Sequence, residues 1–504
     1  MKKTIVLLLA FFFYYTPLWA QAEASVWYFG NKAGIQFINN QIVPLTSSVI
    51  NTDEGCATIS SPQGKLLFYT DGITLYNHLH QATPNGQELK GHSSSTQSAV
   101  VIPNPKNPYL YYLFTIDATA GKNGLCYSEL DMRLDGGKGD IIPDKKNLSI
   151  KQPVTEKLTA VKHRNGIDYW VIVHGWLNGE FLSYLVTAEG INLTPIISKV
   201  GKYHDGTDLN TQGYMKASPD GTSVALALEE SQLFELYDFD NATGKLSNPI
   251  TLSLEANSYP YGIEFSPDGT RLYGSAAGTG KVYQYNLLAG SPDAIKKSAT
   301  VVAKSPAGEW VGALQAAPDG KIYYTLYKTK YLGVIHYPDS LGLKCKAENN
   351  FVNLGEGIAH LGLPTFSQTF FKEEIQEKTI TYFDPNKTIT IGQDIVLNNV
   401  LFEFGKATLQ TSSFAELDKI VEILIKDPSL QIEIAGHTDN IGNKSANLTL
   451  STQRAKSVGD YLVSKNINVA RIAYVGHGSA IPIANNDTEE GRAKNRRVSF
   501  VLKK

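Results

Sequence analysis

Short apolar and aromatic runs alternate with polar turns through residues 25–371, and three of the turns share the sequence Pro-Asp-Gly. These turns span residues 218–222, 266–270 and 317–321 and stand about 50 positions apart. Proline presets its own φ, an Asp side chain can bond its own backbone, and glycine accepts a positive φ, so each turn predicts a hairpin. Each turn is followed by a strand-forming run, at residues 223–228, 271–275 and 322–326.

Three weaker turns extend the pattern towards the N-terminus. They lie at residues 61–65, 103–108 and 163–168, and each precedes an aromatic or β-rich run. Six units spaced by roughly 40 to 60 residues are typical of radial β-sheet repetition. The pattern resembles the WD40-like β-propellers in their Ser-Pro-Asp-Gly variant, although the Gly-His and Trp-Asp signatures do not recur regularly.

We therefore predict a multidomain chain in which residues 25–371 form an all-β propeller of about seven blades. The seventh blade is expected to pair residues 26–30 with the last strands near residues 351–371, which buries an edge strand. Two stacked β-sandwiches are the alternative architecture.

The pattern changes after residue 371. Residues 372–378 are charged and Asp384-Pro385-Asn386 predicts a turn, so residues 372–388 are interpreted as a linker. Residues 389–504 then alternate strand and helix patterns. We expect a strand at 400–404, a helix that Ser412 or Ser413 caps and Asp427-Pro428 ends, a strand at 431–435, a helix at 447–464, and strands at 472–475 and 498–502.

The N-terminus has the pattern of an export signal. Lys2 and Lys3 precede an apolar run over residues 5–15, and the small residues Ala20, Ala22 and Ala24 offer cleavage sites, so residues 1–24 are predicted to be a signal peptide. The first cysteine is Cys56, too far along for a lipid anchor. No later run approaches the 18 apolar residues of a membrane helix, so we expect no transmembrane segment in the mature chain.

Composition narrows the possible partners. A formal net charge of -2 over 504 residues gives no electrostatic reason to expect a nucleic acid. Three cysteines build no disulfide framework. One pair could bridge in an oxidising compartment, but small buried side chains are the more ordinary interpretation. His437 and His477 lack a second ligand at a zinc-like spacing, and we expect them to be structural, with no metal or cofactor.

The C-terminal part carries the most specific motifs: Gly-His-Thr-Asp-Asn at residues 436–440, Asn447, Leu450-Ser451, Arg454-Ala455, and Asn-Arg-Arg-Val at 495–498. This set resembles the OmpA-like domain, which holds the peptidoglycan of Gram-negative bacteria. The resemblance implies an α/β sandwich that binds the diaminopimelate of the stem peptide. That group is a zwitterion, so its site needs an anionic and a cationic side chain a few ångströms apart.

By this resemblance Asp439 receives the ammonium and Arg454 receives the carboxylate. Thr438 and Asn447 are expected to add hydrogen bonds, and Arg496 or Arg497 to contact the stem peptide or glycan. The alternative is that Asp439 and Arg454 form an internal ion pair while residues 495–497 only cap the sheet.

Two functions from different classes follow. The first is a non-enzymatic scaffold of the periplasm and outer membrane, which binds peptidoglycan and presents its propeller to envelope proteins. Residues 27–31 and the polar run at 93–98 are similar to exported Bacteroidetes proteins linked to gliding and type IX secretion. The second is a wall-tethered enzyme that acts on a glycan or lactone. Three or four His, Asp or Glu side chains converging on a metal at the propeller axis favour the enzyme, and a plugged channel favours the scaffold.

Overall fold

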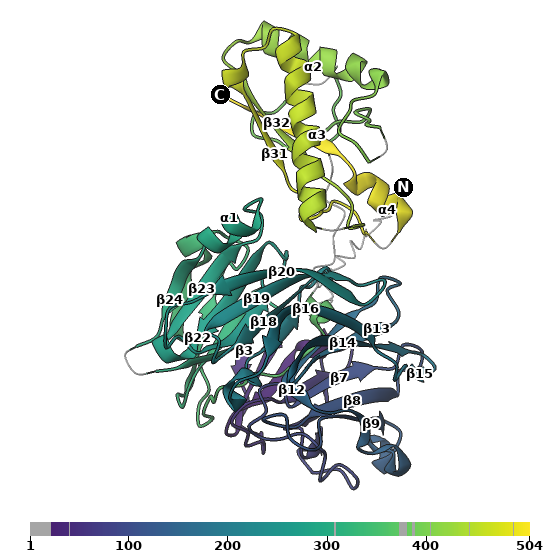
Figure 1. The fold of residues 1–504 in the computed structure, drawn as a ribbon, viewed down its shortest axis with the longest axis vertical. Coiled ribbons are helices and arrows are strands. Elements are labelled where there is room, and N and C mark those ends of the chain that lie inside the picture. Colours follow the sequence, from purple (N-terminus) through teal and green to yellow (C-terminus); the bar gives the residue numbers. More distant parts are fainter. Residues whose placement is uncertain are drawn as a thin grey trace, which may run out of the picture.

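The computed structural model describes residues 22–39, 41–306, 309–371, 381–385, 389–403, 405–442, 444–486 and 488–504. Most of the predicted signal peptide (1–24) and of the predicted linker (372–388) lies outside these residues. Residues 22–371, here called the N-terminal region, are β-rich. Residues 389–504, the C-terminal domain, combine helices with one sheet (Figure 1).

The described N-terminal region contains seven antiparallel sheets that follow one another along the chain. The first sheet contains β1 (Val26–Phe29), β2 (Ala33–Ile38) and β3 (Gln41–Pro44), and the second contains β4 (Ala57–Ser60), β5 (Leu66–Thr70) and β6 (Leu75–Asn77). The third contains β7 (Ala99–Pro103), β8 (Leu110–Ile116) and β9 (Leu125–Asp131), and both β10 (Asp140–Ile141) and β11 (Leu148–Lys151) pair with β9. The fourth contains β12 (Val154–Lys162), β13 (Tyr169–Gly175), β14 (Asn178–Thr187), β15 (Gly190–Ile191) and β16 (Ile196–His204).

The last three sheets have four strands each. The fifth contains β17 (Met215–Ala217), β18 (Ser223–Leu228), β19 (Leu233–Asp240) and β20 (Lys245–Ser253). The sixth contains β21 (Pro260–Phe265), β22 (Arg271–Ala276), β23 (Lys281–Asn286) and β24 (Thr300–Lys304). The seventh contains β25 (Val311–Ala316), β26 (Ile322–Leu326), β27 (Tyr331–Ile335) and β28 (Ala347–Asn353). A short helix, α1 (Pro292–Lys297), lies between β23 and β24.

All six predicted turns join the first two strands of a sheet, so this part of the sequence prediction is confirmed. The turn between β21 and β22 shows why the residues are needed. Ser266 Oγ donates to Asp268 Oδ1 at 2.7 Å, and Thr270 Oγ1 donates to the same carboxylate at 2.7 Å. Gly269 has a φ of 70°, in the left-handed region that favours glycine.

The predicted pairing of the N-terminus with residues 351–371 is wrong. Val26–Phe29 pairs instead with β2, because the chain reverses at Gly30 and Lys32, both with a φ of 55°. The first sheet still contacts the late segment, through a bridge between Asn31 and Ile358 and a ring contact between Trp27 and Phe366 at 6.1 Å.

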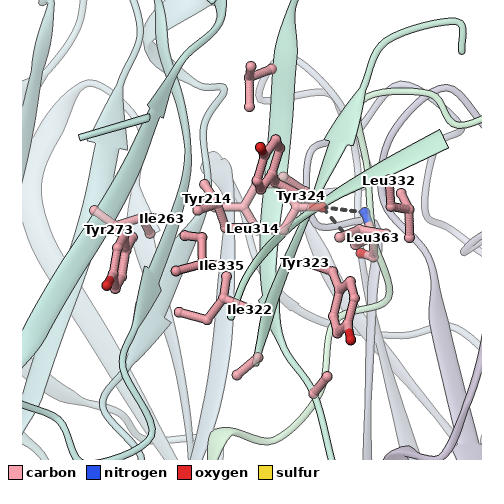
Figure 2. Packing of buried hydrophobic residues seen from close by; sticks show 14 of the residues in the cluster. Tyr214, Ile263, Tyr273, Leu314, Ile322, Tyr323, Tyr324, Leu332, Ile335 and Leu363 are labelled. Carbon is pink, nitrogen blue, oxygen red and sulfur yellow. Dashed lines mark hydrogen bonds between the residues drawn. The ribbon is translucent and has the colours of Figure 1, made fainter. Parts of the chain in front are cut away.

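Apolar side chains fill the space between successive sheets. One buried cluster includes residues of the last three sheets and of the first sheet, so the end of the region packs on its beginning. Figure 2 shows part of this cluster. Tyr214 Oη donates to the Leu363 carbonyl and accepts from the Leu363 amide, both at 3.2 Å, which holds the late segment against the core. Cys56, Cys126 and Cys345 are buried and free, which agrees with their interpretation as small buried side chains.

Polar side chains in, or a few residues before, the first strands of different sheets bond one another. Lys216 Nζ of β17 lies 3.1 Å from Glu264 Oε2 of β21, and both side chains are 0% exposed. Lys216 also donates to Gln315 of β25. Thr96 Oγ1 lies 3.1 Å from Glu54 Oε2 and 2.8 Å from Glu156 Oε2. These buried groups therefore satisfy one another across several sheets.

The C-terminal domain contains α2 (Phe414–Lys426), α3 (Lys444–Ser464), α4 (Glu489–Asn495) and a mixed sheet in the order β29-β32-β30-β31. Its strands are β29 (Ile395–Val396), β30 (Gln431–Gly436), β31 (Ile472–Gly476) and β32 (Val498–Lys503). Strands β30 and β31 are parallel. The two long helices and three of the four predicted strands are confirmed, and Phe383, inside the predicted linker, is buried in this domain's core.

Two expectations for this domain are corrected. Residues 400–403 form no strand, because the chain turns at Gly405 (φ 67°) and Phe402 bridges only to Leu409. Ser413 does not cap α2 with its side chain. Its hydroxyl instead donates to the Leu401 carbonyl at 3.0 Å and fastens the loop before the helix.

We predict that Lys216→Met destabilises the N-terminal region by about 3–5 kcal/mol, because it leaves the buried Glu264 carboxylate without its cation. Urea unfolding of the full chain measures the loss. The double variant Lys216→Met, Glu264→Gln should recover part of it, since the remaining amide carries no charge. A double variant as unstable as the sum of the single variants would contradict the pairing.

We also predict a pH effect at Glu54. Burial, together with the Glu156 carboxylate, raises the pKa of Glu54 to about 8, whereas the unfolded carboxyl ionises near 4.5. Between these values the unfolded chain releases a proton that the folded chain keeps, so stability falls as pH rises. Glu54→Gln removes this contribution. Its Tm relative to wild type should be higher at pH 8 than at pH 5. A Tm difference that is the same at both pH values would contradict the prediction.

Candidate functional site

The candidate site lies at the carboxyl ends of the parallel strands β30 and β31, where α3 packs closely on the sheet. A Cβ on Gly436 would stand 2.1 Å from the Ser451 carbonyl oxygen, and one on Gly476 would stand 2.4 Å from the Thr452 amide nitrogen. Only glycine permits this approach of backbone to backbone. Ser451 Oγ accepts from the Gly478 amide at 2.9 Å and fixes the loop beyond β31.

The loop after β30 sets the position of the Asp439 side chain, which is 11% exposed. Asp439 Oδ1 accepts from the Ile441 amide at 3.0 Å. Thr438 Oγ1 donates to the Asp439 carbonyl at 2.9 Å, and Asn447 Nδ2 donates to the same oxygen at 3.3 Å and to the Ile441 carbonyl at 3.0 Å. Thr438 and Asn447 therefore shape the loop that presents Asp439.

Arg496 is the cation paired with Asp439. Arg496 Nη1 lies 2.7 Å from Asp439 Oδ2, and its Nη2 donates to Glu489 Oε1 at 2.8 Å. Both carboxylates raise the pKa of Arg496. Glu489 belongs to the first turn of α4, which Thr488 caps through a hydrogen bond from the Gly491 amide. Neither α4 nor Glu489 was expected from the sequence, because the helix is short and its hydrophobic pattern is weak.

Arg454, two helical turns beyond Asn447 on α3, is the third charged group. Its guanidinium lies over the Phe402 ring at 5.0 Å, and Nε donates to the Lys406 carbonyl at 3.1 Å. Burial lowers the pKa of Arg454, although the Asp439 carboxylate acts in the opposite direction. Its two terminal amino groups form no hydrogen bond with the described residues.

The structure thus brings Asp439, Arg454 and Arg496 together, but the ion pair of Asp439 is with Arg496 rather than with Arg454. Phe402 and Lys406, which hold Arg454, were not predicted as site residues. An aromatic residue in the apolar run before Gly405 is the sequence signal that could have identified Phe402.

Arg497 lies elsewhere, although it follows Arg496. It is 7% exposed, its Nη2 donates to the Ile481 carbonyl at 3.1 Å, and burial lowers its pKa to about 10. The rings of His437 and His477 are stacked with centroids 5.1 Å apart, and burial lowers the pKa of both imidazoles. The neighbouring Asn495 accepts from the amides of Ile483 and Ala484, so it supports the loop before α4.

Neither a metal site nor a membrane helix is found in the part of the chain that the structure describes. No group of three or more His, Cys, Asp or Glu side chains there is arranged to hold a metal ion. No helix among the same residues is long and apolar enough to cross a membrane.

Comparison with known proteins places the site within a known family. The OmpA family model matches residues 401–496. The peptidoglycan-binding protein ArfA of Mycobacterium tuberculosis is 46% identical over 103 residues, covering 20% of this chain and 32% of ArfA. The probable lipoprotein YiaD of Escherichia coli is 39% identical over 114 residues, covering 22% of this chain and 52% of YiaD.

A solved structure is also similar, that of the peptidoglycan-associated lipoprotein from Burkholderia pseudomallei, with 31% identity and a TM-score of 0.20. It covers 21% of this chain and 88% of that one. The chain spans between a third and about half of the length of the curated relatives ArfA and YiaD. Residues 401–496 are an OmpA family domain, and its relatives include a protein named for peptidoglycan binding.

Proposed function

We propose that the C-terminal domain binds peptidoglycan through the diaminopimelate of the stem peptide. The observation that carries this proposal is the arrangement of one carboxylate, Asp439, near two guanidiniums, one of which keeps its terminal amino groups unbonded among the described residues. A zwitterion fits this arrangement because it supplies one charge of each sign. Similarity to ArfA supports the same ligand class.

Binding exchanges one partner of Asp439 for another. The ammonium of the ligand takes the place of Arg496 Nη1 at Asp439 Oδ2, while Glu489 retains Arg496 Nη2. The carboxylate of the ligand accepts two hydrogen bonds from the terminal amino groups of Arg454, whose orientation Lys406 and Phe402 already determine. Each charge-assisted hydrogen bond contributes about 1.5–3 kcal/mol.

For the N-terminal region we propose that the seven sheets are the blades of a β-propeller, and that this propeller is a non-enzymatic platform for another envelope protein. Three features support the proposal: the uniform order of the sheets, the packing of the last sheets on the first, and the buried polar side chains that bond one another. We place the protein in the periplasm, associated with the outer membrane, and in the Bacteroidetes type of secretion or gliding machinery.

We predict that Asp439→Asn and Arg454→Gln each reduce binding of the full chain to purified sacculi at least tenfold, because each removes one charged partner of the zwitterion. A sacculus pull-down measures the bound fraction. Asp460→Asn and Lys456→Gln are matched controls, since these residues form an exposed ion pair on α3, the helix that carries Arg454. Undiminished binding by Asp439→Asn and Arg454→Gln, with unchanged thermal unfolding, would refute the assignment.

We further predict that the two adjacent arginines differ in effect. The ligand ammonium displaces Arg496 Nη1 from Asp439, and the freed guanidinium can then bind a further carboxylate of the stem peptide. Arg496→Gln should therefore weaken binding about tenfold and reduce its salt dependence. Arg497→Met should leave affinity unchanged, because its side chain is buried away from Asp439. Titration of a soluble stem peptide at two salt concentrations measures both effects. Equal losses in the two variants would contradict the separation of their roles.

A further inference from the structure

A cavity of about 900 Å³ lies between the C-terminal domain and the N-terminal region. One wall comes from the first turns of α3 and the loop at residues 477–480, and the other from β19, β20 and the loops beside α1. Figure 1 shows one end of α3 directed at the N-terminal region near α1 and β20. We call this cavity the interdomain cleft.

The interdomain cleft adjoins the site described above. Asn447 lines it and also holds the Asp439 backbone through its amide. Gly405, which lines it too, precedes Lys406, whose carbonyl accepts from Arg454. The cleft therefore shares Asn447 with the peptide site and reaches Gly405, next to the Lys406 that holds Arg454, although Asp439 and Arg454 do not line it themselves.

The lining combines apolar and hydrogen-bonding groups. Leu236, Ile250, Leu288 and Ile295 supply apolar surface from the N-terminal region. Thr449 and Gln453 of α3 supply polar groups from the opposite wall. The ion pair between Lys444 Nζ and Asp220 Oδ2, at 3.2 Å, crosses between the two parts of the chain. Acetylated sugars have this mixed character, because their ring faces and methyl groups are apolar while their hydroxyls and amides form hydrogen bonds.

We propose that the interdomain cleft binds the N-acetylated disaccharide of the peptidoglycan strand to which the stem peptide is attached. The inference rests on the proposed function, since it needs the stem peptide at Asp439 and Arg454. The volume lies within the range of small-ligand sites and exceeds what a single side chain of the peptide needs. The N-terminal region thereby becomes part of the wall-binding site, and the full chain recognises the glycan as well as the peptide.

Isothermal titration of the full chain tests the proposal. The two probes are a diaminopimelate-containing stem peptide and the same peptide carrying its disaccharide. The disaccharide is expected to tighten binding to the wild-type chain about tenfold. Leu288→Trp and Thr449→Trp fill the cleft from opposite walls, and each should abolish this gain while leaving the affinity for the bare peptide unchanged.

Leu343→Trp and Lys456→Trp are the controls. Leu343 is an exposed residue of a short 3-10 helix (Gly342–Cys345) in the N-terminal region. Lys456 lies on the same face of α3 as Thr449, two turns further along and outside the cleft. Both controls should keep the gain. Equal affinity of the wild-type chain for the two probes, or a gain retained in both filling variants, would overturn the proposal while the peptide site stands. Binding of the bare peptide without binding of the disaccharide probe would likewise overturn the proposal alone. Failure of both probes to bind the wild-type chain would instead refute the peptide site and this inference with it.

Discussion

The close approach of α3 to the ends of β30 and β31 is the constraint on which the rest of the site depends. Gly436 and Gly476 allow it, since a side chain at either position would meet the backbone of residues 451 or 452. The approach brings Asn447 within hydrogen-bond distance of the loop that carries Asp439. It also sets Arg454, two turns further along the helix, within electrostatic reach of the same carboxylate.

Arg454 has no hydrogen bond to a carboxylate among the described residues, and a zwitterion can supply that carboxylate while its ammonium binds Asp439. Asp439 is already bonded to Arg496, so an ammonium alone would have to displace a guanidinium without compensation. A ligand that also brings a carboxylate neutralises Arg454, whose partial burial makes an unpaired charge costly. Both charges of the ligand must therefore bind together. This coupling favours a diaminopimelate end group over a simple amine or a simple acid.

The sequence predicted correctly those elements whose hydrogen-bond partners lie within a few residues of one another. Turns such as residues 266–270 contain their own hydrogen-bond partners, so their sequence suffices to identify them. The residues before Gly405 illustrate the limit. Their alternation predicts a strand, yet Phe402 packs beneath Arg454, about 50 positions away in the sequence. The Asp439–Arg496 pair likewise depends on α4, which turns the chain back towards the site.

An ion pair that joins the two parts of the chain across the cleft is still reached by water. The side chains of Lys444 and Asp220 are 27% and 34% exposed, and ion pairs of this kind contribute about 1 kcal/mol or less. Such a contact therefore adds little to the stability of this arrangement. A glycan that touches both walls of the interdomain cleft, as we propose, would stabilise this arrangement of the two parts by RT ln(1 + [L]/Kd), which grows with the glycan concentration. On the proposed function, the wall would thus help to determine how the N-terminal region is presented.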